Sequence, residues 1–128
     1  MSTHANIHIY DKEERFVSLY KHTDGYPSGL GLELYNFLVN IKLVNGLNPE
    51  MKNVANGMGC LAAQLIANFK TTPGDLYVIS PNSDSLQDFN YHIYGTGGVF
   101  STMVTDFDGE TIYCGLIDDD FMNWTKNC

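Results

Sequence analysis

The sequence has few basic side chains, and Arg15 is its single arginine. Fifteen aspartates and glutamates stand against seven lysines and arginines, which gives a formal net charge of −8 at pH 7. A protein that binds nucleic acid directly needs a stripe of basic side chains to neutralise phosphates, and this chain lacks the residues for a large one. We therefore expect no direct contact with nucleic acid. The acidic surplus is either ordinary solubilising charge or a negative face for a partner with a basic surface.

Long apolar runs and paired cysteines are also missing. No run approaches the ~20 residues that a membrane span needs, and the first fifteen residues lack the apolar segment of a signal peptide. Cys60, Cys114 and Cys128 are widely spaced and form no C-x-x-C pair, which argues against a structural zinc site. We expect Cys60 and Cys114 to be small core residues. The sequence thus predicts a protein of a reducing cytoplasm with no membrane segment.

Enough apolar sequence is present for one folded domain. The chain has 128 residues, of which 44% are hydrophobic, so we expect a single domain over residues 1–128. Alternating apolar residues predict two strands, at 5–10 and 15–21, joined by a charged turn. Apolar residues at helical spacing predict helices over 29–44 and 50–69.

The second half of the sequence favours strands again. Asp108-Gly109 is typical of a hairpin turn between two of them, and the aspartates 118–120 favour the start of a short final helix, where negative charge is stabilising. The order ββααββββ predicts an α+β fold, an antiparallel sheet with two helices packed on one face. The further strands are predicted at 76–80, 89–94, 99–106 and 111–117.

The turn between the second strand and the first helix holds the residues most typical of a site. His22, Asp24 and Tyr26 lie within five residues of one another, and they offer an imidazole that titrates near neutral pH, a carboxylate and an aromatic hydroxyl. Free backbone N–H groups at the start of the next helix would suit a small anionic ligand. In the structural alternative, Asp24 caps the turn, Tyr26 covers the core and His22 ends a strand. Both interpretations stay open.

Other motifs favour structure over chemistry. His92 lies in a predicted strand, and with His8 and His22 it would form a histidine cluster if the fold brought the three together. Metal sites need three or four converging ligands, and scattered strand histidines are more often surface residues, so we predict no metal. Residues 106–111 lack the spacing of a calcium loop. Because the sequence has no phosphate-binding loop and no nucleophile elbow, we expect no cofactor and favour binding over catalysis.

Two segments carry a resemblance to a known group of proteins. Ala5-Asn6-Ile7 and the stretch LYKHTDGYPSGLG at 19–31 resemble small, mostly uncharacterised phage and prophage proteins, whose second strand ends in a His-x-Asp-Gly-Tyr-Pro turn. The resemblance covers roughly the first 45 residues. The sequence departs from that pattern at Lys21 and Thr23, where an arginine and an aromatic residue are expected. The resemblance implies a viral setting and an accessory role, with no defined reaction.

Three functions compete on the sequence alone. The first is a phage-encoded accessory protein in the host cytoplasm that binds a host protein or complex, such as a component of a defence system, and inhibits it. The second is a small-ligand or nucleotide-binding protein, or a hydrolase, that uses His22, Asp24 and Tyr26. The third is a virion or assembly factor. The binding residues that we expect are Asn6, His22, Asp24, Tyr26, His92, Asp118, Asp119 and Asp120.

Overall fold

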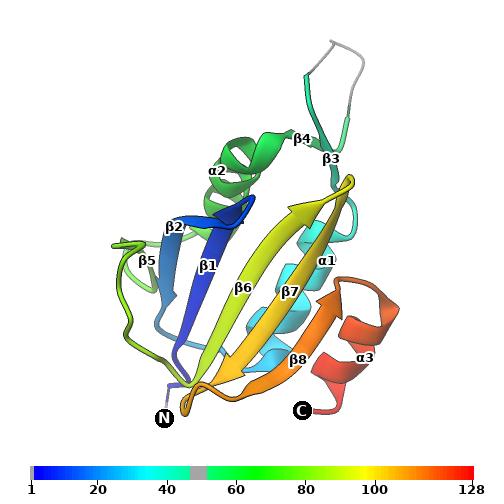
Figure 1. Ribbon diagram of the computed structural model, residues 1–128. Helices are drawn as coiled ribbons and strands as arrows, with labels where there is room; N and C mark the ends of the chain where they lie inside the picture. Colours follow the sequence, from blue (N-terminus) through cyan, green and yellow to red (C-terminus); the bar gives the residue numbers. More distant parts are fainter. Residues whose placement is uncertain (1, 47–51) are drawn as a thin grey trace.

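A computed structural model describes residues 2–46 and 52–128, which form an α+β fold (Figure 1). A six-stranded sheet and a small two-stranded sheet are combined with three α-helices. The elements are β1 (Ala5–Asp11), β2 (Glu14–Lys21), a π-helical turn η1 (Pro27–Gly31), α1 (Leu32–Leu38), β3 (Lys42–Val44), β4 (Val54–Asn56), α2 (Gly57–Phe69), β5 (Leu76–Ile79), β6 (Phe89–Thr96), β7 (Val99–Asp106), β8 (Thr111–Leu116) and α3 (Asp119–Lys126).

The strands of the large sheet lie in the order β5-β2-β1-β6-β7-β8. Neighbours are antiparallel except β1 and β6, which run parallel with Ala5 opposite Phe89 and Ile9 opposite Ile93. The prediction of a purely antiparallel sheet is therefore wrong, although the predicted β1–β2 and β7–β8 hairpins are confirmed. Side chains alternate in both kinds of strand, so periodicity does not separate them. A parallel pair needs a long crossover, and the chain between β2 and β6, which includes α1 and α2, supplies it.

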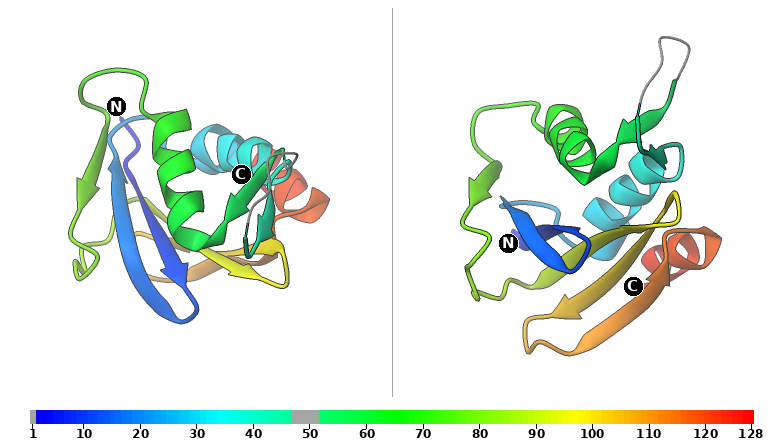
Figure 2. Two further views of the ribbon diagram at one scale, coloured as in Figure 1. Left: turned by 90° about the horizontal axis from the view of Figure 1, so that it is seen from above. Right: turned by 45° about the horizontal axis from the view of Figure 1, so that its top comes forward.

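Helices α1 and α2 cover one face of the large sheet (Figure 2). Leu34 and Leu38 of α1 and Leu61 and Leu65 of α2 are buried against this face. The apolar residues of the alternating strands point toward the helices, as predicted for 5–10. The main buried side chains of the sheet are Ala5, Ile7, Ile9, Leu19, Tyr91, Ile93 and Val104.

Both long helices are shorter than the sequence predicts. The helix expected over 29–44 ends at Leu38, because residues 42–44 instead form β3 and pair with β4. Leu43 N donates to Gly98 O at 3.2 Å, so tertiary pairing overrides the helical spacing of the apolar residues there. The helix expected over 50–69 begins at Gly57, and its predicted opening at residue 50 lies outside the described residues.

Two further expectations concern the burial of the cysteines and the absence of a membrane-spanning segment. Cys114 is exposed, because β8 is an edge strand, so the prediction that it is a core residue is wrong. Cys60 is half-buried and packs against the core. Among residues 2–46 and 52–128, no helix has both the length and the apolar character needed to cross a membrane.

Segment 80–88, which joins β5 to β6, lies against part of the sheet face turned away from the helices, as its hydrogen bonds show. Asn6 Nδ2 donates to Ser85 O at 2.8 Å, and Arg15 Nη1 donates to Ser83 O at 3.2 Å. Because segment 80–88 lies over this face, strand residues whose side chains point away from the core are also buried. Asn6 is 1% exposed and His8 is 3% exposed.

Candidate functional site

The predicted binding side chains of the turn at 22–26 are exposed and do not form a shared network. Within the described residues, His22, Asp24 and Tyr26 make no side-chain hydrogen bonds to one another. His22 Nδ1 is instead hydrogen-bonded to Tyr20 Oη at 2.9 Å, and its ring stacks on His4 with centroids 4.5 Å apart. These contacts hold His22 against β2 rather than against Asp24.

The backbone of the same turn is tightly tied to the fold. Gly25 N donates to Thr3 O at 2.9 Å, and the buried Tyr91 hydroxyl donates to Gly25 O at 2.7 Å. Asp24 adopts the left-handed conformation with a φ of 57°, and its carbonyl accepts from Leu30 N at 2.9 Å. The backbone of this turn is therefore held by structural contacts. However, Tyr26 is exposed rather than covering the core, and within the described residues the Asp24 side chain makes no hydrogen bond that would cap the turn. The role of the turn as a ligand site stays a prediction.

The three aspartates at 118–120 lie at the start of α3, as the sequence predicts. Asp118 Oδ1 accepts from Asp120 N at 3.0 Å and from Phe121 N at 3.3 Å, so Asp118 is the N-cap of the helix. Tyr35 Oη donates to Asp119 Oδ1 at 3.1 Å. Two of the three carboxylates thus hold local structure, and their contact with a basic partner stays a prediction.

Replacing Asp118 with alanine should lower the free energy of unfolding by about 1 kcal/mol, because two backbone N–H groups of α3 lose their acceptor. The matched control is Asp120→Ala, which removes the same charge but no capping bond, and we expect it to cost less than about 0.5 kcal/mol. Urea denaturation of both variants measures the difference. Equal losses would show that charge, rather than the cap, accounts for the effect.

Asn6 and His92 belong to a polar cluster on the sheet face turned away from the helices. The parallel register of β1 and β6 places Asn6 beside Asn90 and His8 beside His92. Asn6 Nδ2 donates to Asn90 Oδ1 at 3.1 Å, and the two imidazole centroids are 5.0 Å apart. The fold therefore brings two of the predicted site residues together, and it adds a second histidine and a second amide to them.

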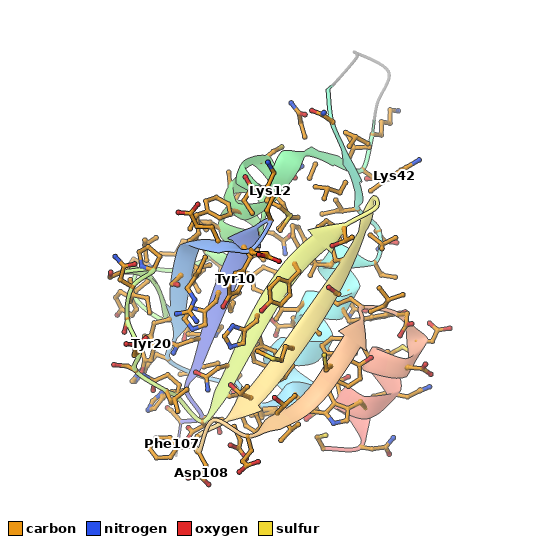
Figure 3. All side chains as sticks on the ribbon, in the orientation of Figure 1. Tyr10, Lys12, Tyr20, Lys42, Phe107 and Asp108 are labelled. Carbon is orange, nitrogen blue, oxygen red and sulfur yellow. The ribbon has the colours of Figure 1, made fainter. Side chains whose placement is uncertain are left out.

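Each imidazole of the cluster is held through its Nδ1 atom. His8 Nδ1 bonds Ser18 Oγ at 2.7 Å, and His92 Nδ1 bonds Tyr10 Oη at 2.8 Å. Arg15 Nε donates to the same Tyr10 oxygen at 3.1 Å, which leaves the hydroxyl proton available for His92 Nδ1 and favours a hydrogen on Nε2. Tyr10 lies over the sheet face seen in Figure 3. Within the described residues, neither Nε2 atom has a hydrogen-bond partner.

Burial and positive charge keep both imidazoles neutral at pH 7. Desolvation, followed by the charges of Arg15 and His92, lowers the pKa of His8 to about 3. Desolvation and the Arg15 charge lower the pKa of His92 to about 4. Each ring is consequently an uncharged group with one donor and one acceptor nitrogen.

A pocket of about 150 Å³ opens where segment 80–88 covers this cluster. His8, Arg15, Asn90 and His92 line it from the sheet, and residues 83–86 line it from the covering segment. Asn6 Oδ1, on the same sheet face, is buried and has no hydrogen-bond partner among the described residues. In residues 2–46 and 52–128, no three histidine, cysteine, aspartate or glutamate side chains are arranged to hold a metal ion.

Sequence reasoning selected Asn6 and His92 but missed Tyr10, Arg15 and Asn90 as members of the same cluster. Two signals point to them in retrospect: Arg15 is the single arginine, and Tyr10 lies on the polar side of an alternating strand. Neither signal shows that β1 lies beside β6.

Known proteins provide no relative on which to base a function. No family model matches this chain, and neither curated proteins nor solved structures include a significant match. The resemblance to phage proteins therefore stays a prediction, and the function is argued from the geometry of the pocket.

Proposed function

We propose that this protein acts by binding, and that the pocket of His8, Arg15 and His92 takes the phosphate or carboxylate group of a small ligand. The observation that carries the proposal is the convergence of one guanidinium and two uncharged imidazoles on one small pocket. Both imidazoles are held through Nδ1, so their Nε2 atoms are the groups left to meet a ligand. Oxyanions are bound by such sets of N–H donors.

The charge balance inside the pocket supports an anionic group. Arg15 is positively charged, and two of its nitrogens are fixed by Tyr10 and Ser83, so the guanidinium is held in place before a ligand arrives. The His92 imidazole donates through Nε2 without adding charge, and the His8 imidazole is uncharged as well. Asp84 also lines the pocket, but it is exposed, so water and salt screen its repulsion.

The sequence places a small-ligand site at the turn of residues 22–26, whereas the site proposed here lies on the sheet face. In both cases the proposed activity is binding. A phage-encoded accessory protein that sequesters a small anionic compound would need only such a pocket and no catalytic group. The predicted phage origin and the proposed site are therefore compatible. A host partner protein stays a separate prediction.

The test is a titration of histidine side-chain ¹⁵N signals with sodium phosphate and with sodium acetate, at constant ionic strength maintained with sodium chloride. We expect saturable shifts at His8 and His92 with one oxyanion or both, and none with chloride alone. The stronger of the two responses distinguishes a phosphate from a carboxylate ligand. An absence of saturable shifts with both anions would contradict the proposal.

Arg15→Met should weaken the binding of the better anion at least tenfold, which corresponds to about 1.4 kcal/mol. Lys126→Met is the matched control, because it removes the same charge from α3, where the residue is exposed. Arg15→Lys keeps the charge but loses the planar fork, and it should retain part of the affinity. Equal weakening by Arg15→Met and Lys126→Met would indicate diffuse charge attraction instead of a site.

A further inference from the structure

A second and larger cavity lies on the helix side of the sheet, between α1 and α2. Its volume is about 800 Å³, which is within the range of about 300–1,000 Å³ for small-molecule sites. Both helices cover this face of the sheet (Figure 2), and residues of both line the cavity. It is therefore separate from the oxyanion pocket on the opposite face.

Side-chain amides line this cavity from both helices. Asn36 and Asn40 lie four residues apart at α1, and Gln64 and Asn68 lie four residues apart in α2. Residues at this spacing share one face of a helix, so α2 presents two amides to the cavity. Asn36 lies in α1, and Asn40 lies in the turn that follows the end of α1 at Leu38. Asn53, just before β4, contributes a fifth.

Two of these amides are used by the fold, and two are free to bind. Gln64 Nε2 donates to Val54 O at 3.0 Å, and Asn40 Nδ2 donates to Asn36 O at 3.3 Å. The side chains of Asn36 and Asn68 have no hydrogen-bond partner within residues 2–46 and 52–128. The cavity thus holds donors and acceptors that the fold itself does not use.

Two aromatic rings add an apolar surface beside the amides. Phe37 and Phe69 contact each other edge to face, with ring centroids 5.7 Å apart, and both line the cavity. Each follows one of the lining amides in the sequence, Asn36 and Asn68 respectively. A ligand here would meet polar groups and an aromatic surface together.

The charged residues of the cavity largely neutralise each other. Lys21 Nζ donates to Asp75 Oδ2 at 2.5 Å and to Thr23 O at 2.9 Å. Asp75 Oδ1 accepts from Thr23 N at 2.9 Å. Glu33 is the remaining charged residue of the lining, and it is exposed. An anionic ligand would therefore find no unpaired cation in the lining, and the unpaired carboxylate of Glu33 is screened by water and salt.

We infer that this cavity binds a neutral, hydroxyl-rich ligand, of the chemical class of a sugar or the ribose of a nucleoside. An amide offers two N–H donors and an acceptor oxygen, and a hydroxyl group offers one O–H donor and an acceptor oxygen, so each can both donate to and accept from the other. The Phe37 and Phe69 rings would pack against the C–H groups on one face of the sugar ring. This inference is independent of the proposed oxyanion pocket.

The test follows the side-chain NH₂ signals of the protein by NMR while glucose, maltose, N-acetylglucosamine or adenosine is added at millimolar concentrations. We expect saturable shifts at Asn36 and Asn68 with at least one probe. A response to the saccharides indicates a sugar ligand, and a response to adenosine alone indicates a nucleoside. The inference is overturned if no probe produces a saturable shift at these amides.

The double variant Asn36→Leu/Asn68→Leu should weaken binding of the responding probe at least tenfold. Asn123→Leu is the matched control, since it replaces an exposed helical amide in α3 and should leave binding unchanged. The double variant Asn36→Ser/Asn68→Ser should show a similar loss without added apolar surface, so it covers a folding or solubility defect of the leucine variant. Undiminished binding in the serine variant would contradict the inference.

Discussion

Replacing Gly25 with alanine is expected to lower the free energy of unfolding by about 3 kcal/mol, the upper part of the usual range for overpacking. A Cβ atom at this position would lie 2.7 Å from Ala5 Cβ and 3.0 Å from both Ala5 N and His4 C. These atoms belong to the start of β1 or are fixed directly to its backbone, so no side-chain rotation relieves the clash.

The clash would also disturb two hydrogen bonds. Gly25 N donates to Thr3 O, and Gly25 O accepts from the Tyr91 hydroxyl in the core. A shift of the turn would leave the buried Tyr91 hydroxyl without its acceptor, and an unpaired buried polar group costs further stability.

Gly59→Ala is the matched control for this prediction. Gly59 lies in α2, and nothing lies within 4 Å of the position that its Cβ would take. Alanine is the better helix former, so we expect a gain of about 0.5–1 kcal/mol. Chemical denaturation measures both variants. If Gly25→Ala proved as stable as the native protein, close packing of the turn against β1 would not be the reason for glycine there.

Acidification from pH 7 to about 4 should destabilise the protein through His8 and His92. Both imidazoles have folded-state pKa values, about 3 and about 4, below the ordinary value of 6.5. The unfolded chain therefore binds more protons in this interval. The stabilisation is complete above pH 6.5 and is lost as the pH falls toward 4. With allowance for solvent in the pocket, the loss is on the order of 2 kcal/mol for each histidine.

Asp75, a carboxylate with a shifted pKa, acts in a lower pH range and does not obscure this effect. Burial opposes the ionisation of Asp75, but hydrogen bonds from Lys21 and Thr23 outweigh it and lower the pKa of Asp75 below its usual 3.8. Its contribution is complete above that value and is lost only as the pH falls through the lowered pKa. The interval between pH 6.5 and 4 thus reports on the two histidines.

Urea denaturation at a series of pH values tests this expectation. The double variant His8→Gln/His92→Gln should have a flatter stability profile between pH 6.5 and 4, because it has no imidazole to protonate in the pocket. His22→Gln replaces an exposed histidine and should leave the steep profile unchanged. A native profile that is flat in this interval would contradict the assignment of two neutral, buried imidazoles.

The sequence by itself determined those elements that form through interactions between near neighbours in the chain. Alternation at 5–10 predicts a strand because side-chain direction depends only on the strand's own backbone. Asp108-Gly109 predicts the β7–β8 turn because that turn needs a positive φ, and Gly109 has a φ of 81°. Asp118 predicts the start of α3 because its carboxylate reaches N–H groups two and three residues away.

The lengths of the helices could not be predicted from local sequence chemistry alone. Residues 42–44 fit helical spacing in the sequence, yet they form β3, because a strand partner and Gly98 satisfy their backbone. The turn at 22–27 gives a second case. Glycine at 25 suggests a positive φ, but Asp24 takes that conformation, and Gly25 is required for contact with Ala5, which lies 20 positions earlier.

The candidate sites were decided only by the tertiary structure. The parallel register of β1 and β6 places His8 beside His92 and Asn6 beside Asn90, although each pair is 84 positions apart in the sequence. Segment 80–88 then buries them, which is why the two imidazoles are neutral. Residue types and periodicity specify which side chains face away from the core. Which of those side chains meet depends on strand order, and strand order is set by packing between distant segments rather than by the properties of any one of them.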